Sequence, residues 1–392
     1  MAAPFLKKYR KFLKVILLLL VLGSPVWMWL AWLSSPTKKL TIAIIDKTVL
    51  TQKIQAHRSL NWVLNYEKFT KNKTELYQPQ RDYFGFFPSV NGKYIVRGLE
   101  RFNKSQLEQL SDDAQAIYLA DAYGIYKKDW YTTTSALPQE GILYGGMSEE
   151  DLYFLQQMKA KHKLIITEFN CLGAPTSSMI RTQFEHSFGM QWTGWIGRYF
   201  TSLDTTENKD IPRWLIKSYK EQHHNRWPFT KSGIVFIKDG DNVVVLEKDK
   251  ELNDELPRIK AGIEEQQHYG LPASIKYSFW FDVIKIDSSF NHTIASFSID
   301  ANAKGKQLLQ QAGIPSLFPA ITVHRNNDYR FFYFSADFSD SPVNLVSSHF
   351  KGIPYIDFIM YNTADPEERE SFFWKAYRPL LTRILNDYYN NN

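Results

Sequence analysis

The order of apolar and polar positions divides most of the chain into alternating strands and helices. Leu164, Ile165 and Ile166 form a continuous apolar run, which is typical of a strand covered on both faces in a parallel sheet. A turn of polar and small residues follows, and Thr176 or Ser177 can cap the helix that comes next. The helix is indicated by apolar residues at every fourth position and by a closing glycine: Ile180, Phe184, Phe188 and Gly189.

The same alternation recurs on both sides of this central unit. Further strands are expected at 40–45, 93–97, 114–120, 320–324 and 330–336, and further helices at 52–65, 148–160 and 304–312. Residues 68–89 are aromatic without clear periodicity and predict a long loop. Strands and helices in turn favour right-handed crossover units. We therefore expect an α/β fold with a mostly parallel sheet flanked by helices, of the flavodoxin type.

The pattern changes after residue 199. Two apolar runs flank Asp239-Gly240-Asp241, which indicates a hairpin, and 279–286 with 293–299 predicts another antiparallel pair. The expected domain plan has five parts: a basic tail at 1–14, an anchor at 15–33, the α/β domain at 40–199, a β-rich insertion or subdomain at 200–300, and completion of the α/β domain with a C-terminal helix at 301–390.

An apolar run near the start predicts a transmembrane helix. Residues 15–33 are interrupted only by Gly23, Ser24 and Pro25, and as a helix they would extend about 28 Å, roughly the hydrocarbon thickness. Basic residues in the tail 1–14 keep that tail in the cytoplasm by the positive-inside rule and export the rest. A cleaved signal peptide is the competing interpretation, but no small-x-small site follows directly. We therefore expect a single-pass membrane protein whose globular domain lies outside the cytoplasm. A bacterial envelope protein is favoured over a secreted eukaryotic one, because the lone cysteine allows no internal disulfide.

The distribution of charged residues along the chain limits the classes of partner that the protein can bind. Seven of the 47 basic residues lie in the first 39 positions, which hold no acid, so the remainder has 40 basic residues against 41 acidic ones. That near-neutral remainder excludes nucleic acid as a partner despite the net charge of +6. His223 and His224 would point about 100° apart on a helix, so we expect no metal site. No cofactor is expected, and protein partners stay open.

Acidic residues end several of the predicted strands. Asp46, Asp121 and Glu168 each close an apolar run, Asp337 closes another, and Asn170 lies beside Glu168. Ligands bind at the carboxyl edge of open α/β sheets, so we expect these side chains to meet at one rim. The candidate catalytic set is Glu168 with Asp121 or Asp46, because paired carboxylates can perform acid–base chemistry or hold a sugar. Each acid can alternatively cap a helix or simply end a strand.

Six residues are candidates for ligand binding: Tyr123, Asn170, Cys171, Arg198, Asp337 and His349. Arg198 lies among large aromatic residues and needs a partner there. Its aromatic neighbours could form a stacking floor for a sugar, or belong to the core. Cys171 as a nucleophile would need a histidine, for which His349 is the candidate. The alternative for Cys171 is a small buried apolar residue.

The segment Phe169–Gly173 resembles the nucleophile turn of the class I glutamine amidotransferase-like superfamily, a flavodoxin-like α/β group. In that family a cysteine follows a strand, usually as Gly-x-Cys-x-Gly, and a histidine and an acid arrive late in the chain. Cys171 and Gly173 match, whereas Phe169 replaces the first glycine and no His-x-Glu pair follows the late strand. The resemblance implies an amidotransferase-like fold, and the expected compartment does not suit glutaminase activity.

Three functions fit these observations. The first is a membrane-anchored extracytoplasmic protein whose strand-edge cleft binds an envelope ligand, carbohydrate in class. The second is an envelope hydrolase or transferase that uses the strand-end carboxylates. The third is a non-enzymatic scaffold of an envelope assembly. Two carboxylates facing each other within about 5–10 Å would favour the second, and a flat exposed apolar patch would favour the third.

Overall fold

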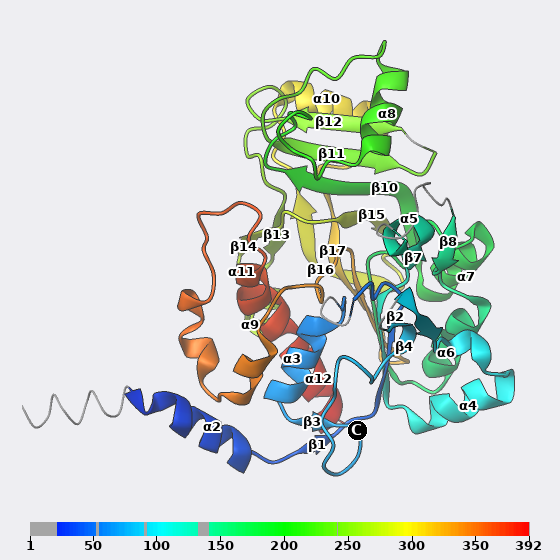
Figure 1. The fold of residues 1–392 in the computed structure, drawn as a ribbon, viewed down its shortest axis with the longest axis vertical. Coiled ribbons are helices and arrows are strands. Elements are labelled where there is room, and N and C mark those ends of the chain that lie inside the picture. The colour runs from blue at the N-terminus through cyan, green and yellow to red at the C-terminus, as the bar shows by residue number, and fades with distance from the viewer. Residues whose placement is uncertain (1–21, 52–54, 90–91, 132–140, 241, 392) are drawn as a thin grey trace, which may run out of the picture.

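The computed structural model describes residues 22–51, 55–89, 92–131, 141–240 and 242–391 (Figure 1). Its centre is a ten-stranded sheet in the order β14-β13-β16-β17-β18-β9-β6-β2-β4-β5. Five neighbouring strands are parallel: β18 (Arg330–Phe334), β9 (Leu164–Glu168), β6 (Ala116–Asp121), β2 (Ile42–Asp46) and β4 (Phe84–Pro88). The outer strands pair antiparallel: β14 (Ser274–Lys276), β13 (Arg258–Ala261), β16 (Asn291–Ser298), β17 (Leu317–His324) and β5 (Tyr94–Val96).

A mixed α/β architecture with a large sheet and flanking helices is confirmed, but the expectation of a mostly parallel sheet is wrong. Residues 325–329 join β17 to β18, and so short a connection cannot make the crossover that parallel neighbours need. The predicted pairing of 279–286 with 293–299 is also wrong. β15 (Phe281–Ile286) pairs with β10 (Met190–Phe200), whereas β16 pairs with β13 and β17.

Alternate residues of the central strands point to opposite faces of the sheet. Ile42 and Ile44 belong to one hydrophobic core, and Ala43 and Ile45 belong to another. Helices that pack in the first core include α3 (Arg58–Tyr66), α12 (Arg378–Asn390) and, at its margin, α9 (Ile263–Tyr269), and Leu309 from the helix at 303–312 is also part of it; the second core contains α4 (Lys104–Asp113), α6 (Glu149–Ala160) and α7 (Ser178–Phe188). Because helices cover both faces, the central strands read as continuous apolar runs.

The central strand and helix form as predicted. All five residues of β9 are buried. Ser177 caps α7 by accepting a hydrogen bond from the Ile180 backbone at 3.3 Å, and the buried face consists of Ile180, Phe184 and Phe188. Gly189 ends the helix with a φ of 64°, and a Cβ there would lie 2.6 Å from the nearest side-chain atom. This position therefore requires glycine.

A second, four-stranded antiparallel sheet lies at the top of Figure 1 and contains β12 (Val243–Glu247), β11 (Gly233–Lys238), β10 and β15. Pairing of β11 with β12 confirms the predicted hairpin, and α8 (Arg213–Gln222) and α10 (Ala303–Ala312) pack beside it. Asp282 of β15 joins the two sheets. Its backbone N–H donates to the Ser335 carbonyl at 2.7 Å, and its carboxyl group accepts from the Tyr333 hydroxyl. The segment 200–300 thus contributes strands to both sheets.

The stretch 68–89 is more regular than the predicted loop. It contains β3 (Phe69–Thr70), which pairs with β1 (Lys38–Lys39), and it ends in β4, which pairs with β2. β4 was missed because its run of aromatic residues around Gly85 has no alternation of apolar and polar positions.

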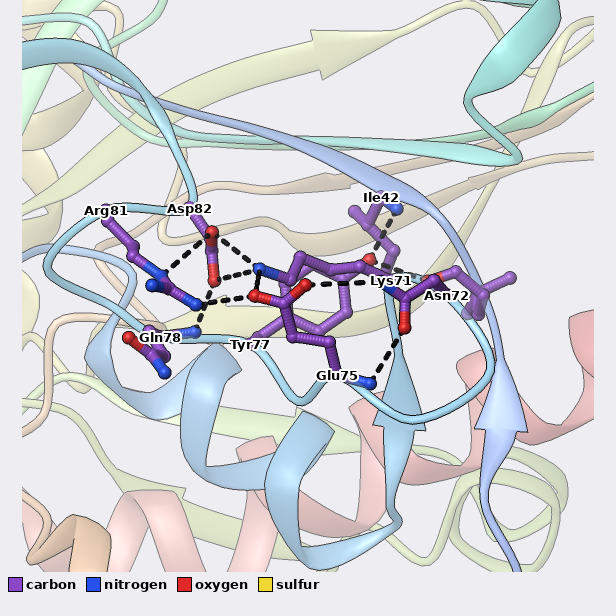
Figure 2. Close-up of polar contacts among 9 residues, drawn as sticks. Ile42, Lys71, Asn72, Glu75, Tyr77, Gln78, Arg81 and Asp82 are labelled. Carbon is purple, nitrogen blue, oxygen red and sulfur yellow. Dashed lines mark hydrogen bonds and ion pairs between the residues drawn. The ribbon is translucent and has the colours of Figure 1, made fainter.

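The loop between β3 and β4 is held by an ion-pair network, drawn in Figure 2. The Lys71 ammonium group lies 2.8 Å from Glu75 and 2.9 Å from Asp82. The buried Tyr77 hydroxyl accepts a hydrogen bond from the backbone N–H of Ile42 at 2.7 Å. These contacts fasten the loop to the start of β2.

At the N-terminus, α2 (Ser24–Ser34) precedes β1. Among the residues that the structure describes, no helix combines the length and apolar character that crossing a membrane requires. The expected span 15–33 lies partly, and the basic tail 1–14 wholly, outside those residues, so the anchor stays a prediction. Trp32 is buried and donates from its indole N–H to the Asn65 carbonyl at 3.0 Å, which docks the end of α2 on the domain.

The last helical segment changes its pitch twice. It runs through α11 (Glu370–Phe372) and a π-helical turn, η6 (Phe373–Tyr377), into α12. Pro379 lies just beyond this turn and lacks the N–H that a regular helix would use. The remaining short elements are η2 (Leu99–Arg101), β7 (Ile125–Tyr126), α5 (Lys127–Trp130), β8 (Ile142–Tyr144), η3 (Leu345–His349), η4 (Ile353–Tyr355) and η5 (Asp357–Ile359).

Candidate functional site

The parallel strands bring their terminal acids to one edge of the sheet. Asp46 at the end of β2 is in register with Asp121 at the end of β6, next to a β-bulge. Glu168 ends β9 opposite Phe334, the last residue of β18, and Asp337 follows three residues later. Burial is the main cause of the raised pKa of Asp337, and the charges of Asp121 and Glu168 raise it further. The four acids therefore lie close enough to sense one another.

Asp46 is fully buried and is paired with His57, a residue for which the sequence indicated no role. Its Oδ2 lies 2.6 Å from His57 Nδ1, and His57 Nε2 lies 2.9 Å from the carbonyl oxygen of Pro79. A carbonyl oxygen only accepts, so Nε2 is the donor in that contact, and Nδ1 faces the Asp46 carboxyl group. His57 has no free nitrogen to act as a base. Pro79 lies between β3 and β4, so the loop that joins these strands supports the pair of Asp46 and His57.

Asp121 anchors the part of the edge that reaches the surface. Its Oδ1 accepts from Thr48 Oγ1 and from the backbone N–H of Tyr123, both at 2.6 Å, and its Oδ2 accepts from Asn170 Nδ2 at 3.2 Å. Thr48 and Asn170 are half-buried and Tyr123 is 37 % exposed. Burial, and next the charge of Asp46, raise the pKa of Asp121 to about 7. Proton-bearing and ionised forms of this carboxyl group are thus both accessible near neutral pH.

Asn170 is the unusual residue of this cluster. Its φ of 68° is left-handed, a conformation that costs energy for a residue with a side chain and that often occurs at functional sites. The turn between β9 and α7 places its amide on Asp121.

Glu168 is enclosed by the protein. The Tyr118 hydroxyl contacts its Oε1, and the backbone N–H and hydroxyl of Ser339 donate to its Oε2 at 3.1 and 2.9 Å. Tyr118 also bonds the Tyr377 hydroxyl at 2.8 Å. Burial raises the pKa of Glu168 to about 8, so the carboxyl group keeps its proton at neutral pH. With both oxygens occupied and no exposed surface, Glu168 braces β9 against the segment after β18; the catalytic role expected for it stays a prediction.

Asp337 follows β18 of the large sheet, whereas Arg198 belongs to β10 of the second sheet. Arg369 donates to the Asp337 carbonyl oxygen at 3.5 Å, and its guanidinium lies 3.7 Å from the ring centroid of Phe279. Arg198 lies 5.0 Å from the same ring, and burial lowers its pKa. Its Nε has no hydrogen-bond partner among the described residues. The Arg198 guanidinium group therefore packs on aromatic faces, and the charged groups that act on it include Glu367 and Asp210.

Cys171 and His349 do not come together as a catalytic pair. Cys171 is fully buried, and burial followed by the nearby carboxylates raises its thiol pKa well above the usual range. Such a thiol is a poor nucleophile. His349 packs edge-on against Trp32 of α2, with ring centroids 4.5 Å apart. The left-handed residue of the turn is Asn170 and not Cys171.

Sequence reasoning located the strand-end acids but missed the residues that hold them. Tyr118 stood inside an apolar strand and Ser339 in an unpatterned loop, and no spacing rule points to either. The turn after Asp46 could have been noticed, because an aspartate that ends a strand commonly accepts from the backbone N–H two residues later, as Thr48 N–H does at 3.0 Å, but the hydroxyl contact of Thr48 with Asp121 has no local signal. Within the described residues, no group of three or more histidine, cysteine or acidic side chains is arranged to hold a metal ion.

No protein-family model matches the chain, and no curated protein matches it significantly. Among solved structures, a ThuA-like protein from Parabacteroides merdae is 11% identical, with 76% of this chain and 78% of that one covered and a TM-score of 0.34. The carbohydrate deacetylase Agd3 is 11% identical over 87% of this chain and 33% of its own, at a TM-score of 0.32. A β-galactosidase from Bacillus circulans sp. alkalophilus is 9% identical over 61% of this chain, at a TM-score of 0.27.

The chain spans only 22% of the length of that β-galactosidase. These likenesses are too low for an activity or a substrate to be inferred from them, so the residues themselves have to support any functional proposal.

Proposed function

We propose that the carboxyl edge around Asp121 binds a hydroxyl-rich ligand of the carbohydrate class. The supporting observation is the cluster of Asp121, Asn170 and Thr48 at the partly exposed end of β6. A sugar hydroxyl both donates and accepts, and this cluster offers a carboxyl group, an amide and a hydroxyl group within hydrogen-bond reach of one another.

An aromatic surface adjoins these polar groups. The rings of Tyr123 and Tyr126 lie 5.0 Å apart, and Tyr123 is the exposed member of the pair. The apolar face of a sugar ring can pack on such a side chain while its hydroxyl groups reach the polar cluster. The left-handed backbone of Asn170 contributes to the proposed site, because it holds the side-chain amide against Asp121.

The test is ligand-induced thermal stabilisation of the full chain in detergent, with peptidoglycan fragments and lipopolysaccharide core oligosaccharides as probes. Asp121→Asn should weaken the apparent affinity obtained from this stabilisation at least tenfold, since the amide NH2 group donates where a carboxylate oxygen accepts. Asp282→Asn is the matched control, because Asp282 is another buried acid whose pKa burial raises to about 7, away from the exposed cluster. Equal stabilisation of both variants would contradict the proposal.

Catalysis is the second candidate function. Asp121 titrates near neutral pH beside Asp46, the arrangement that an acid–base pair of a hydrolase or transferase needs. Release of new reducing ends from the same oligosaccharides, abolished in Asp121→Asn, would establish it. A scaffold role would instead leave the protein unaffected by all of these probes.

We further propose that residues 15–33 anchor the chain in a bilayer and that the domain lies outside the cytoplasm. The length and hydropathy of the run and the basic tail before it support this proposal. Resistance of the membrane-bound protein to alkaline carbonate extraction tests the anchor, and protease accessibility in spheroplasts tests the side.

A further inference from the structure

Large apolar side chains are exposed on α2. Val26, Trp27 and Leu30 are between 42 % and 60 % exposed, although the other side of the helix docks on the domain through Trp32. The described residues 22–36 carry no charged side chain. An apolar surface of this kind is unusual on a protein that faces only water.

A second exposed apolar group lies in the segment of η3, η4 and η5, more than 300 residues later in the chain. Tyr355 is 88 % exposed, and Phe358 and Ile359 are 66 % and 64 % exposed. The short helices of this segment hold these side chains away from the core, since none of the three belongs to a buried cluster.

The two groups belong to neighbouring elements. The backbone N–H of Lys351 donates to the Met28 carbonyl at 3.1 Å, and the His349 ring packs on Trp32. Figure 1 accordingly shows the orange segment beside the dark blue helix α2. We name the exposed residues of α2 and of 345–360 together the apolar face.

We infer that the apolar face lies against a lipid bilayer, with 345–360 as a second membrane contact beside α2. The inference rests on the proposed anchor. Residues 24–33 of the proposed anchor belong to α2, so the segment 345–360 that touches α2 lies next to the point where the anchor leaves the bilayer. Tryptophan, tyrosine and phenylalanine are the residues expected at the headgroup level.

The charged residues around the apolar face are also consistent with contact with a lipid bilayer. The tail 1–14 holds basic residues and no acid, and the face is bordered by Lys351 and Lys375, whose ammonium groups lie 4.3 Å from the Tyr66 ring and 4.8 Å from the Tyr361 ring. The one acid within 345–360 is Asp357, whose charge acts on Arg378. Basic groups next to apolar ones favour anionic lipid headgroups. Two contacts rather than one would fix the tilt of the domain above the membrane.

The test uses single introduced cysteines in the full chain, reconstituted in vesicles of phosphatidylethanolamine and phosphatidylglycerol. Cys171 is buried with a raised thiol pKa, so the unmodified protein is the unlabelled blank. Phe358→Cys and Tyr355→Cys carry an environment-sensitive fluorophore. Trp214→Cys is the matched control, because Trp214 is also a large exposed apolar residue but lies on α8, in the lobe at the top of Figure 1.

We expect blue-shifted emission at 355 and 358 and at least twofold quenching by nitroxide-labelled lipids, with neither change at 214. If the protein floats with the vesicles but the fluorophore at 358 emits as it does in water, the inference is wrong, whereas the proposed anchor at 15–33 is not contradicted. A blue shift without lipid quenching would overturn it in favour of a protein partner. Protein that fails to float would overturn the anchor and this inference together, while the oligosaccharide test of the Asp121 cluster is read separately.

Discussion

Single carboxyl groups at the strand edge keep their protons to an unusually high pH. The ordinary pKa of a glutamic acid is 4.5, whereas burial raises that of Glu168 to about 8. A folded pKa above the unfolded one means that the native state binds the proton more tightly. The stabilising contribution is then complete below the unfolded pKa and is lost as the pH rises through the folded pKa.

We therefore expect the free energy of unfolding to fall between about pH 4.5 and pH 8, by an order of a few kcal/mol, with Asp121 contributing up to its pKa of about 7. Glu168→Gln should flatten the profile, since an amide keeps the hydrogen bonds to Ser339 without titrating. Urea unfolding at five pH values measures this. A variant with the same slope as the natural protein would show that Glu168 is not the titrating group.

At the residue scale, the sequence predicted where the acidic residues lie along the strands better than it predicted how deeply they are buried. That Asp46, Asp121 and Glu168 would end strands followed from the apolar runs before them. Their burial did not, because it depends on Tyr118, Ser339 and other side chains that the fold brings from distant parts of the chain.

Among the elements, β9 and α7 illustrate a unit that the sequence specifies locally. Strand, cap, apolar stripe and closing glycine all lie within residues 164–189, so no distant contact is needed to predict them. β4 is the opposite case, since its pairing with β2 gives it a strand conformation that its own pattern does not indicate.

Gly189 provides a test of the idea that nearby residues alone determine where the helix α7 ends. Gly189→Ala must adopt a left-handed φ and also place its methyl group 2.6 Å from a Phe290 atom. Gly313 ends α10 with a similar φ of 70° but has open space around it. We expect Gly313→Ala to cost about 1 kcal/mol and Gly189→Ala clearly more, measured as the urea midpoint. Equal losses would mean that the backbone relieves the clash.

The loop of Figure 2 provides a test of whether contacts from outside β2 stabilise that strand. The Tyr77 hydroxyl accepts from the Ile42 N–H and donates to the Leu40 carbonyl at 2.6 Å. Tyr77→Phe leaves both buried groups unpaired and should lower the free energy of unfolding by about 1–3 kcal/mol. Tyr94→Phe, at an exposed position, is the control. Faster hydrogen exchange should appear at β2, and unchanged exchange there would contradict this account.

For the whole molecule, the junction between the two sheets decides how rigidly the lobes move together. Asp282 and Tyr333 form that junction inside the protein. Tyr333→Phe removes the hydroxyl that satisfies a buried carboxyl group and should cost about 1–3 kcal/mol. Hydrogen exchange should rise in β15 and β10 more than in β2. A uniform increase across both sheets would indicate one cooperative unit instead.

This junction could not be derived from the sequence. The antiparallel strands of 279–299 look like partners in one hairpin, yet β15 and β16 belong to different sheets. Which strand leaves a sheet depends on the packing of the complete core, whereas periodicity reports only which residues are buried.

The direction of β2 determines from which side a ligand can approach the acidic residues at the carboxyl ends of the strands. In Figure 1 the strand rises from the end that carries α2, so its amino end lies nearer to α2 and its carboxyl end farther away. At about 3.3 Å per residue, the four steps from Ile42 place Asp46 roughly 13 Å beyond the start of the strand. If α2 rests on lipid, the rim opens away from the bilayer, toward soluble chains or polymers in the space beyond, and a substrate still embedded by its acyl tails would sit below its reach.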